Sequence, residues 1–121
     1  MREFAIVAAL LGAAAVALGA FGAHALRDHF DAASMQVWHT AVEYQFWHVL
    51  ALLAVVALAR DCRWRAWRVA ALAFIAGIIL FCGSLYALAL GAPKFVGVMT
   101  PLGGLCFIIG WVAFAVAVLR R

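Results

Sequence analysis

The chain has 121 residues, of which 70% are hydrophobic and 12% are charged. A soluble domain this small has a large surface relative to its volume and carries about 25% charged residues to cover it. The composition therefore excludes a soluble globular protein. It predicts one integral membrane domain over residues 1–121, in contact with the lipid bilayer.

The net charge of +4 does not indicate a nucleic-acid partner, because the arginines flank apolar segments. Four lie together between two such segments and two close the chain: Arg60, Arg63, Arg65, Arg68, Arg120 and Arg121. This distribution is typical of the positive-inside rule. The three cysteines lack the paired spacing of a disulfide framework or a thiolate metal site.

Four apolar segments, residues 4–23, 35–59, 69–90 and 101–119, each approach or exceed the roughly 20 residues that cross a bilayer. They predict an all-α fold in which four transmembrane helices form an up-down bundle. Small residues recur every three or four positions in the first segment: Ala8, Gly12, Ala15, Gly19, Gly22 and Ala23. Such a ridge predicts close packing of a neighbouring helix.

Residues 24–37, between the first two segments, have a different pattern. Leu26, Phe30, Ala33 and Val37 share one helical face, which predicts a short amphipathic helix lying at the membrane interface. Asp31 or Ser34 is expected to cap the helix that follows. Thr100-Pro101 suits the first turn of the last helix, because proline lacks an N–H that would be unpaired there.

Four spans place both termini on one side of the membrane. Seven of the nine Lys and Arg residues lie on that side, and only Arg27 and Lys94 lie on the other. The positive-inside rule then predicts a multi-pass inner-membrane protein with both termini in the cytoplasm.

Polar side chains gather in the outer half of the second span, at His39, Glu43, Tyr44, Gln45 and His48. Such groups are costly in lipid, which makes them candidates for a functional site. At 100° per residue, His39, Glu43, Tyr44 and His48 cover about half of the helix circumference and Gln45 lies outside this arc, which is too wide a spread for one compact site.

His39 and Glu43 are four residues apart and lie side by side on a helix. Imidazole and carboxylate suit zinc, iron or copper, so a metal site at these two residues, helped by His24, is one hypothesis. The favoured alternative is that the polar groups join helices through hydrogen bonds. No cofactor is therefore predicted, although a bound metal ion stays open. A haem between His24 and His48 is disfavoured because the two histidines are expected to lie at different depths in the membrane.

Four stretches occur in the order of a known family signature: residues 19–26 (GAFGAHAL), 38–48 (WHTAVEYQFWH), 83–88 (GSLYAL) and 100–111 (TPLGG, then GW). The chain resembles the DUF423 family of small four-helix membrane proteins, which includes bacterial inner-membrane proteins and animal transmembrane protein 256. The resemblance implies a four-helix inner-membrane protein and no particular activity. Six candidate ligand-binding residues lie at matching positions of the signature: His24, Tyr44, Gln45, His48, Ser84 and Tyr86. The resemblance adds weight to His24 and His48 as a shared polar centre. His39 and Glu43 fall at variable positions of the motif, which argues against a metal site shared by the family.

Two functions from different classes follow. The favoured one is a structural or accessory membrane subunit that associates with other membrane proteins or with itself, since no nucleophile–base pair, phosphate loop or metal motif is legible. The alternative is a protein that binds or transports a metal ion, a proton or a quinone-like molecule at the extracytoplasmic end of the second helix. An enzyme is the third choice, and no catalytic residue is assigned.

Overall fold

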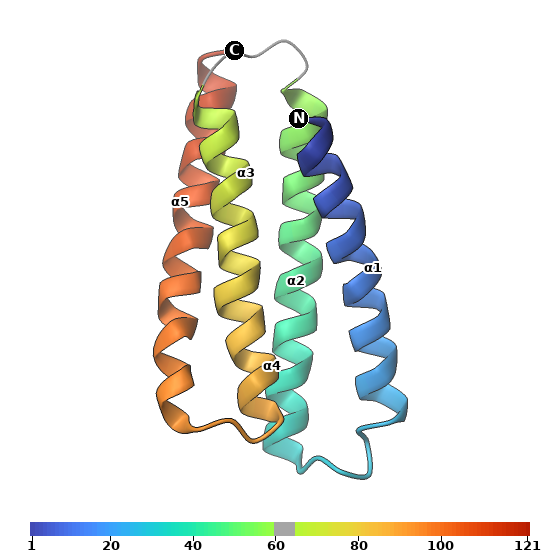
Figure 1. Ribbon diagram of the computed structural model, residues 1–121. Helices are drawn as coiled ribbons and strands as arrows, with labels where there is room; N and C mark the ends of the chain where they lie inside the picture. The colour runs from blue at the N-terminus through green and yellow to red at the C-terminus, as the bar shows by residue number, and fades with distance from the viewer. Residues whose placement is uncertain (60–64) are drawn as a thin grey trace.

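The computed structural model describes residues 1–59 and 65–121, and in these ranges the chain forms helices and turns without a strand. Four helical segments are long and apolar enough to cross a membrane. They are α1 (Arg2–His24), α2 (Ala32–Leu58), the third span made of α3 (Arg65–Gly77), η1 (Ile78–Cys82) and α4 (Gly83–Ala89), and the last span made of η2 (Lys94–Val98) and α5 (Met99–Leu119). Successive spans alternate in direction, so both termini lie at one end (Figure 1). The predicted all-α fold with four spanning helices is confirmed.

The helix expected at the interface between the first two spans is absent from the structure. Residues 25–31 form turns and a bend, and the chain from Ala32 onward belongs to α2. The Asp31 side chain accepts a hydrogen bond of 2.7 Å from the Ser34 N–H and caps α2 there, as predicted. Leu26 and Phe30 are apolar because the turn folds them against Trp38, and not because they line a separate helix.

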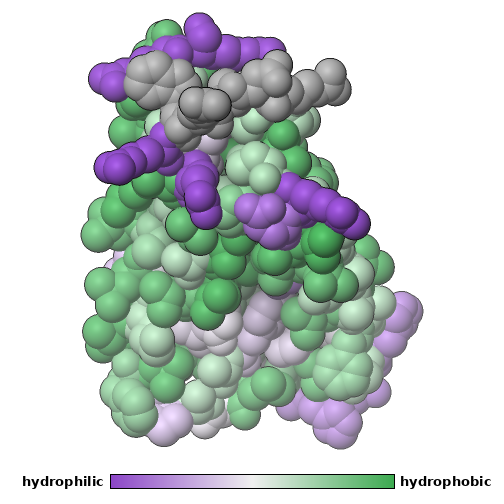
Figure 2. Space-filling model, turned by 45° about the horizontal axis from the view of Figure 1, so that its top comes forward, coloured by the Kyte–Doolittle hydropathy of each residue, from purple (hydrophilic) through white to green (hydrophobic). Residues whose placement is uncertain are grey.

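The four spans of the bundle stand side by side in an open row (Figure 1). α1 packs on α2, α5 packs on the third span, and α2 and the third span lie between them. The buried share of the apolar window is therefore 44% in α2 and 39% in the third span, but only 17% in α1 and 22% in the last span. Figure 2 shows hydrophilic side chains gathered at the end that carries the termini, and apolar side chains over much of the remaining visible surface.

The contact between α1 and α2 depends on the small residues of α1. Ala8, Ala15 and Gly22 are buried. A methyl group at Gly22 would overlap the indole of Trp38, so glycine is required for this approach. The predicted ridge is present except at Ala23, which is exposed.

The contact between the third span and α5 is reciprocal, with glycine on one helix facing phenylalanine on the other. The pairs are Gly77 with Phe107, Gly110 with Phe74, and Gly103 with Phe81. They keep one antiparallel register, since each step along the third span matches an equal step back along α5. A Cβ at Gly103 would lie 2.7 Å from the Phe81 Cα, which shows that the two backbones touch.

A π-helical turn, η1, interrupts the third span at this close contact. Such single turns widen the helix locally and often occur at functional sites. Phe81 lies in this turn, and its ring stacks on Tyr44 of α2 with centroids 4.5 Å apart. The turn thus places an aromatic ring between α2 and α5.

Candidate functional site

Gln45 joins three helices at the centre of the molecule. It is only 3% exposed. Its Nε2 donates to the Leu11 carbonyl of α1 at 2.8 Å, and its Oε1 accepts from the Tyr86 hydroxyl of α4 at 2.8 Å. Because both ends of the amide are used, the arrangement supports the predicted packing role for Gln45 and Tyr86.

Two further bonds connect neighbouring spans in the same way. The Trp38 indole N–H donates to the Leu18 carbonyl at 2.9 Å. The Ser84 hydroxyl donates to the Phe81 carbonyl at 2.9 Å and lies 2.6 Å from the Thr100 hydroxyl. Since Ser84 has one proton and gives it to the carbonyl, Thr100 is the donor between the two hydroxyls. Interhelical hydrogen bonds of this kind contribute about 0.6–2 kcal/mol each.

His48 is held in one neutral tautomer by its two neighbours. Its Nδ1 lies 2.7 Å from the Tyr44 carbonyl, which can only accept, so Nδ1 carries the proton. Nε2 is then the acceptor for the Trp111 indole N–H, at 3.3 Å. The imidazole also stacks on Phe107 with ring centroids 3.5 Å apart. The bond at Nδ1 is short, whereas the bond at Nε2 is longer than the usual range, so Nε2 makes the weaker hydrogen bond.

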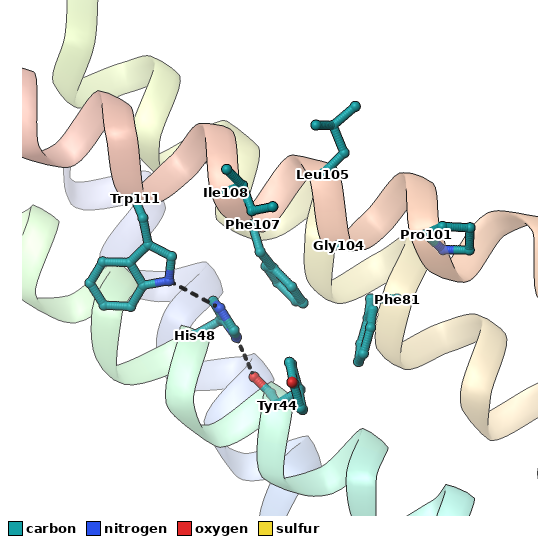
Figure 3. A pocket seen from close by; sticks show the side chains of 9 residues that line it. All are labelled: Tyr44, His48, Phe81, Pro101, Gly104, Leu105, Phe107, Ile108 and Trp111. Carbon is teal, nitrogen blue, oxygen red and sulfur yellow. Dashed lines mark hydrogen bonds between the residues drawn. The ribbon is translucent and has the colours of Figure 1, made fainter.

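These residues border a groove of about 530 Å³ between α2 and α5 (Figure 3). In the close view, Tyr44, His48, Phe81 and Phe107 lie in the space between the two helices. The lining residues are Tyr44, His48, Phe81, Pro101, Gly104, Leu105, Phe107, Ile108 and Trp111. The α5 residues on its rim, Leu105 and Ile108, are more than half exposed, so the groove opens sideways on the surface that an apolar span presents to lipid.

Tyr44 provides the uncommitted polar group of this groove. Its ring is half-buried and contacts Trp47, His48, Phe81 and Phe107. Its hydroxyl has no hydrogen bond to any other residue within the described ranges. A hydroxyl donor in a mostly apolar groove is the arrangement that orients a ligand.

The structure divides the six predicted ligand-binding residues into three groups. Tyr44 and His48 line the groove. Gln45, Ser84 and Tyr86 bond to one another or to neighbouring helices, as described above. His24 is exposed in the last turn of α1, and the structure describes no contact between His24 and His48. A polar centre shared by these two histidines is therefore not formed.

His39 and Glu43, the predicted metal ligands, are exposed on the opposite face of α2 from His48. Residues 1–59 and 65–121 contain no group of three or more His, Cys, Asp or Glu side chains placed to hold a metal ion. A metal bound there would need ligands from outside this set, and the metal site stays a prediction.

Sequence reasoning missed the contribution of α5 to the site. Trp111 lies near the middle of its span, far from the interfaces where tryptophan is usually found, and this position was the available signal. Gly104 had no comparable signal, since the last helix contains three glycines. Only the neighbouring helix distinguishes Gly104, which borders the groove, from Gly103 and Gly110, which face phenylalanines.

Comparison with known proteins identifies the family. Residues 18–104 match the model of the family described as "Protein of unknown function (DUF423)". The chain is 41% identical to the UPF0382 membrane protein YwdK of Bacillus subtilis, over 99% of this chain and 98% of the relative. It is 40% identical to a UPF0382 membrane protein of Staphylococcus epidermidis, with the same coverage.

A third relative, the UPF0382 inner membrane protein YgdD of Escherichia coli, is 42% identical over 98% of this chain and 91% of the relative. No solved structure matches the chain. The four apolar spans, the family match and the membrane proteins among its relatives agree with one another. The chain belongs to the DUF423 family and is a small integral membrane protein.

Proposed function

We propose that this protein binds a lipophilic molecule taken from the bilayer into the groove between α2 and α5. The observation that carries the proposal is the free hydroxyl of Tyr44 in an otherwise mostly apolar groove that opens sideways. Ligand sites in proteins combine an apolar lining with a few oriented polar groups. A ligand that enters from lipid needs no aqueous path.

The lining suggests the class of ligand. The Tyr44 hydroxyl can donate to a carbonyl oxygen, and the rings of Phe81 and Phe107 can pack against a planar ring. Among the predicted candidates, a quinone-like molecule supplies both features. An ester carbonyl of a phospholipid supplies only the first.

The interior polar residues support packing more than transport. Gln45 and Tyr86 satisfy each other, and Ser84 and Thr100 do likewise, so their hydrogen bonds are already used within the molecule. This arrangement favours a binding protein with a rigid scaffold. The predicted accessory role requires, in addition, a partner surface elsewhere on the molecule.

The proposal includes a location in the inner membrane with both termini in the cytoplasm. Its support is the name of the Escherichia coli relative, an inner membrane protein, and the position of Arg2, Arg65, Arg68 and Arg120 at the end that carries the termini. Arg27 and Lys94 lie at the other end. In this orientation the groove lies in the outer half of the bilayer.

Substitution of Gly104 tests the groove directly. A Cβ at Gly104 would lie 3.9 Å from the nearest atom, Phe81 Cδ2, so the backbone tolerates a side chain there while leucine would fill the groove. Gly83→Leu is the matched control, because a Cβ at Gly83 meets nothing within 4 Å. Each protein is purified in mild detergent, and the retained molecules are extracted and weighed by mass spectrometry.

The unmodified protein and Gly83→Leu are expected to retain the same lipophilic molecule in stoichiometric amount, and Gly104→Leu to lose it. A quinone and a phospholipid are distinguished by their masses. Equal recovery from all three proteins, or recovery of nothing from the unmodified one, would contradict the proposal. Elemental analysis of the same preparation tests the predicted metal site at His39 and Glu43.

A further inference from the structure

The outward face of α2 carries an exposed seam that no other described helix covers. Its members are Gln36, His39, Glu43, Leu50, Leu53 and Ala57, all exposed. They occupy the first and fourth positions of successive heptads, and the half-buried Phe46 fills the remaining fourth position. A repeat of 3.5 residues is the pattern by which two helices pack along a shared seam.

The polar part of the seam lies within the depth of the bilayer. Gly19 of α1 faces Val42 of α2, so Glu43 lies at about the level of Leu18. Leu18 is inside the apolar run of α1. Leu18 precedes the end of α1 by about 9 Å, at a rise of about 1.5 Å per residue. A carboxylate facing lipid at that depth is unfavourable without a partner.

The described part of the chain does not supply that partner. The ion pair found in residues 1–59 and 65–121 joins the N-terminal ammonium to Glu3, and neither His39 nor Glu43 has a hydrogen bond there. α1 packs against one side of α2 and the third span against another, and the seam faces away from both. Whatever covers the seam therefore comes from outside the described residues.

We propose that a second copy of this chain covers the seam, with two α2 helices side by side and parallel. The seam is self-complementary, because it contains an imidazole and a carboxylate one helical turn apart. In a two-fold dimer, residue i of one copy contacts residue j of the other and the reverse also holds. His39 of each copy then meets Glu43 of the other, and Leu50 and Leu53 pack beneath them. The axis lies along the membrane normal, as parallel topology in one bilayer requires.

Disulfide cross-linking in native membranes tests this dimer. Leu50→Cys places a thiol on the seam, and Leu10→Cys on α1 is the matched control. The two leucines are 61% and 66% exposed. They lie at similar depth, because Gly12 faces Val49 across the α1–α2 contact. Catalysed oxidation is expected to convert Leu50→Cys into a dimer of twice the chain mass and to leave Leu10→Cys at the level of the unmodified protein.

A charge exchange tests the polar pairing in the Leu50→Cys background. Adding His39→Glu places four carboxylates together and is expected to abolish the cross-linked dimer. Adding both His39→Glu and Glu43→His keeps one acid and one base in the seam and is expected to restore it. Because the seam faces outward, unchanged thermal unfolding verifies that each variant folds.

The proposal is overturned if Leu50→Cys cross-links no more than Leu10→Cys, or if its product has the mass of a different protein. It is also overturned if the charge exchange fails to restore the dimer that His39→Glu abolishes. These outcomes are independent of the ligand groove, which lies on the other side of α2.

Discussion

The two outer helices are attached to the centre of the molecule by different means. α1 presents small residues to α2, and its backbone carbonyls accept hydrogen bonds from the Trp38 and Gln45 side chains of α2. α5 and the third span instead exchange glycine and phenylalanine in alternation, down to contact between backbones. The α1–α2 contact depends on a few hydrogen bonds, each of which can be removed separately. The contact between the third span and α5 depends on glycines that leave no room for a Cβ atom.

The largest expected effect is on the contact between the third span and α5. Gly103→Ala places a Cβ against the Phe81 backbone, which cannot rotate away as a side chain can. Overpacking costs about 1–3 kcal/mol, and we expect the upper end of that range or more. Thermal unfolding in detergent measures it, and Gly12→Ala is the control, because its Cβ would lie an ordinary 3.5 Å from Val49. Equal losses of stability in the two variants would show that the two helix contacts tolerate an added Cβ atom equally well.

A smaller effect is expected on the contact between α1 and α2. Gln45→Leu removes the bond to the Leu11 carbonyl and leaves the Tyr86 hydroxyl without its acceptor. The Leu11 carbonyl keeps its helical partner, so we expect a loss of about 1–2 kcal/mol in the free energy of unfolding. Chemical denaturation in detergent measures this loss. A loss of stability as large as that of Gly103→Ala would show that the hydrogen-bonded α1–α2 contact is no easier to perturb than the glycine-dependent contact of α5.

The two tyrosines of the central region provide a finer comparison. Tyr86→Phe breaks the bond to Gln45 and is expected to cost about 0.6–1.7 kcal/mol. Tyr44→Phe removes a hydroxyl that makes no hydrogen bond to a described residue. The melting temperature of this variant should therefore equal that of the unmodified protein. Tyr44→Phe should instead reduce retention of the lipophilic ligand. If Tyr44→Phe destabilises the protein as much as Tyr86→Phe does, the hydroxyl of Tyr44 is structural and the proposed function loses its support.

The smallest effect is expected at the turn between α1 and α2. The hydrogen bond from the Ser34 N–H lowers the pKa of the Asp31 carboxyl below its ordinary value. A carboxyl whose pKa is lowered by folding stabilises the fold above its unfolded pKa, and that stability is lost as pH falls through the folded pKa. Melting temperature should therefore decrease slightly at acidic pH, and Asp31→Asn should remove that part of the decrease. An unchanged pH profile in Asp31→Asn would show that the cap does not contribute.

The site shows where prediction from sequence ended. Tyr44 and His48 were identified because polar groups are conspicuous in an apolar helix. Gln45 and Tyr86 looked the same by that criterion, and only their positions on facing helices show that they bond to each other. The spacing of Leu26, Phe30, Ala33 and Val37 predicts an interfacial helix, yet Leu26 and Phe30 lie in a turn that packs on Trp38, and Ala33 and Val37 belong to α2.

The sequence by itself determined the number of spans, the shared side of the termini and the ridge of α1. These follow from local properties, namely the number and length of apolar runs and the periodicity of small residues. The tertiary structure decided which polar groups are used, where the π turn lies, and that Gly104 borders a groove while Gly103 touches a backbone. Those features depend on what faces each residue across a helix contact, and the pattern of a single helix does not contain that information.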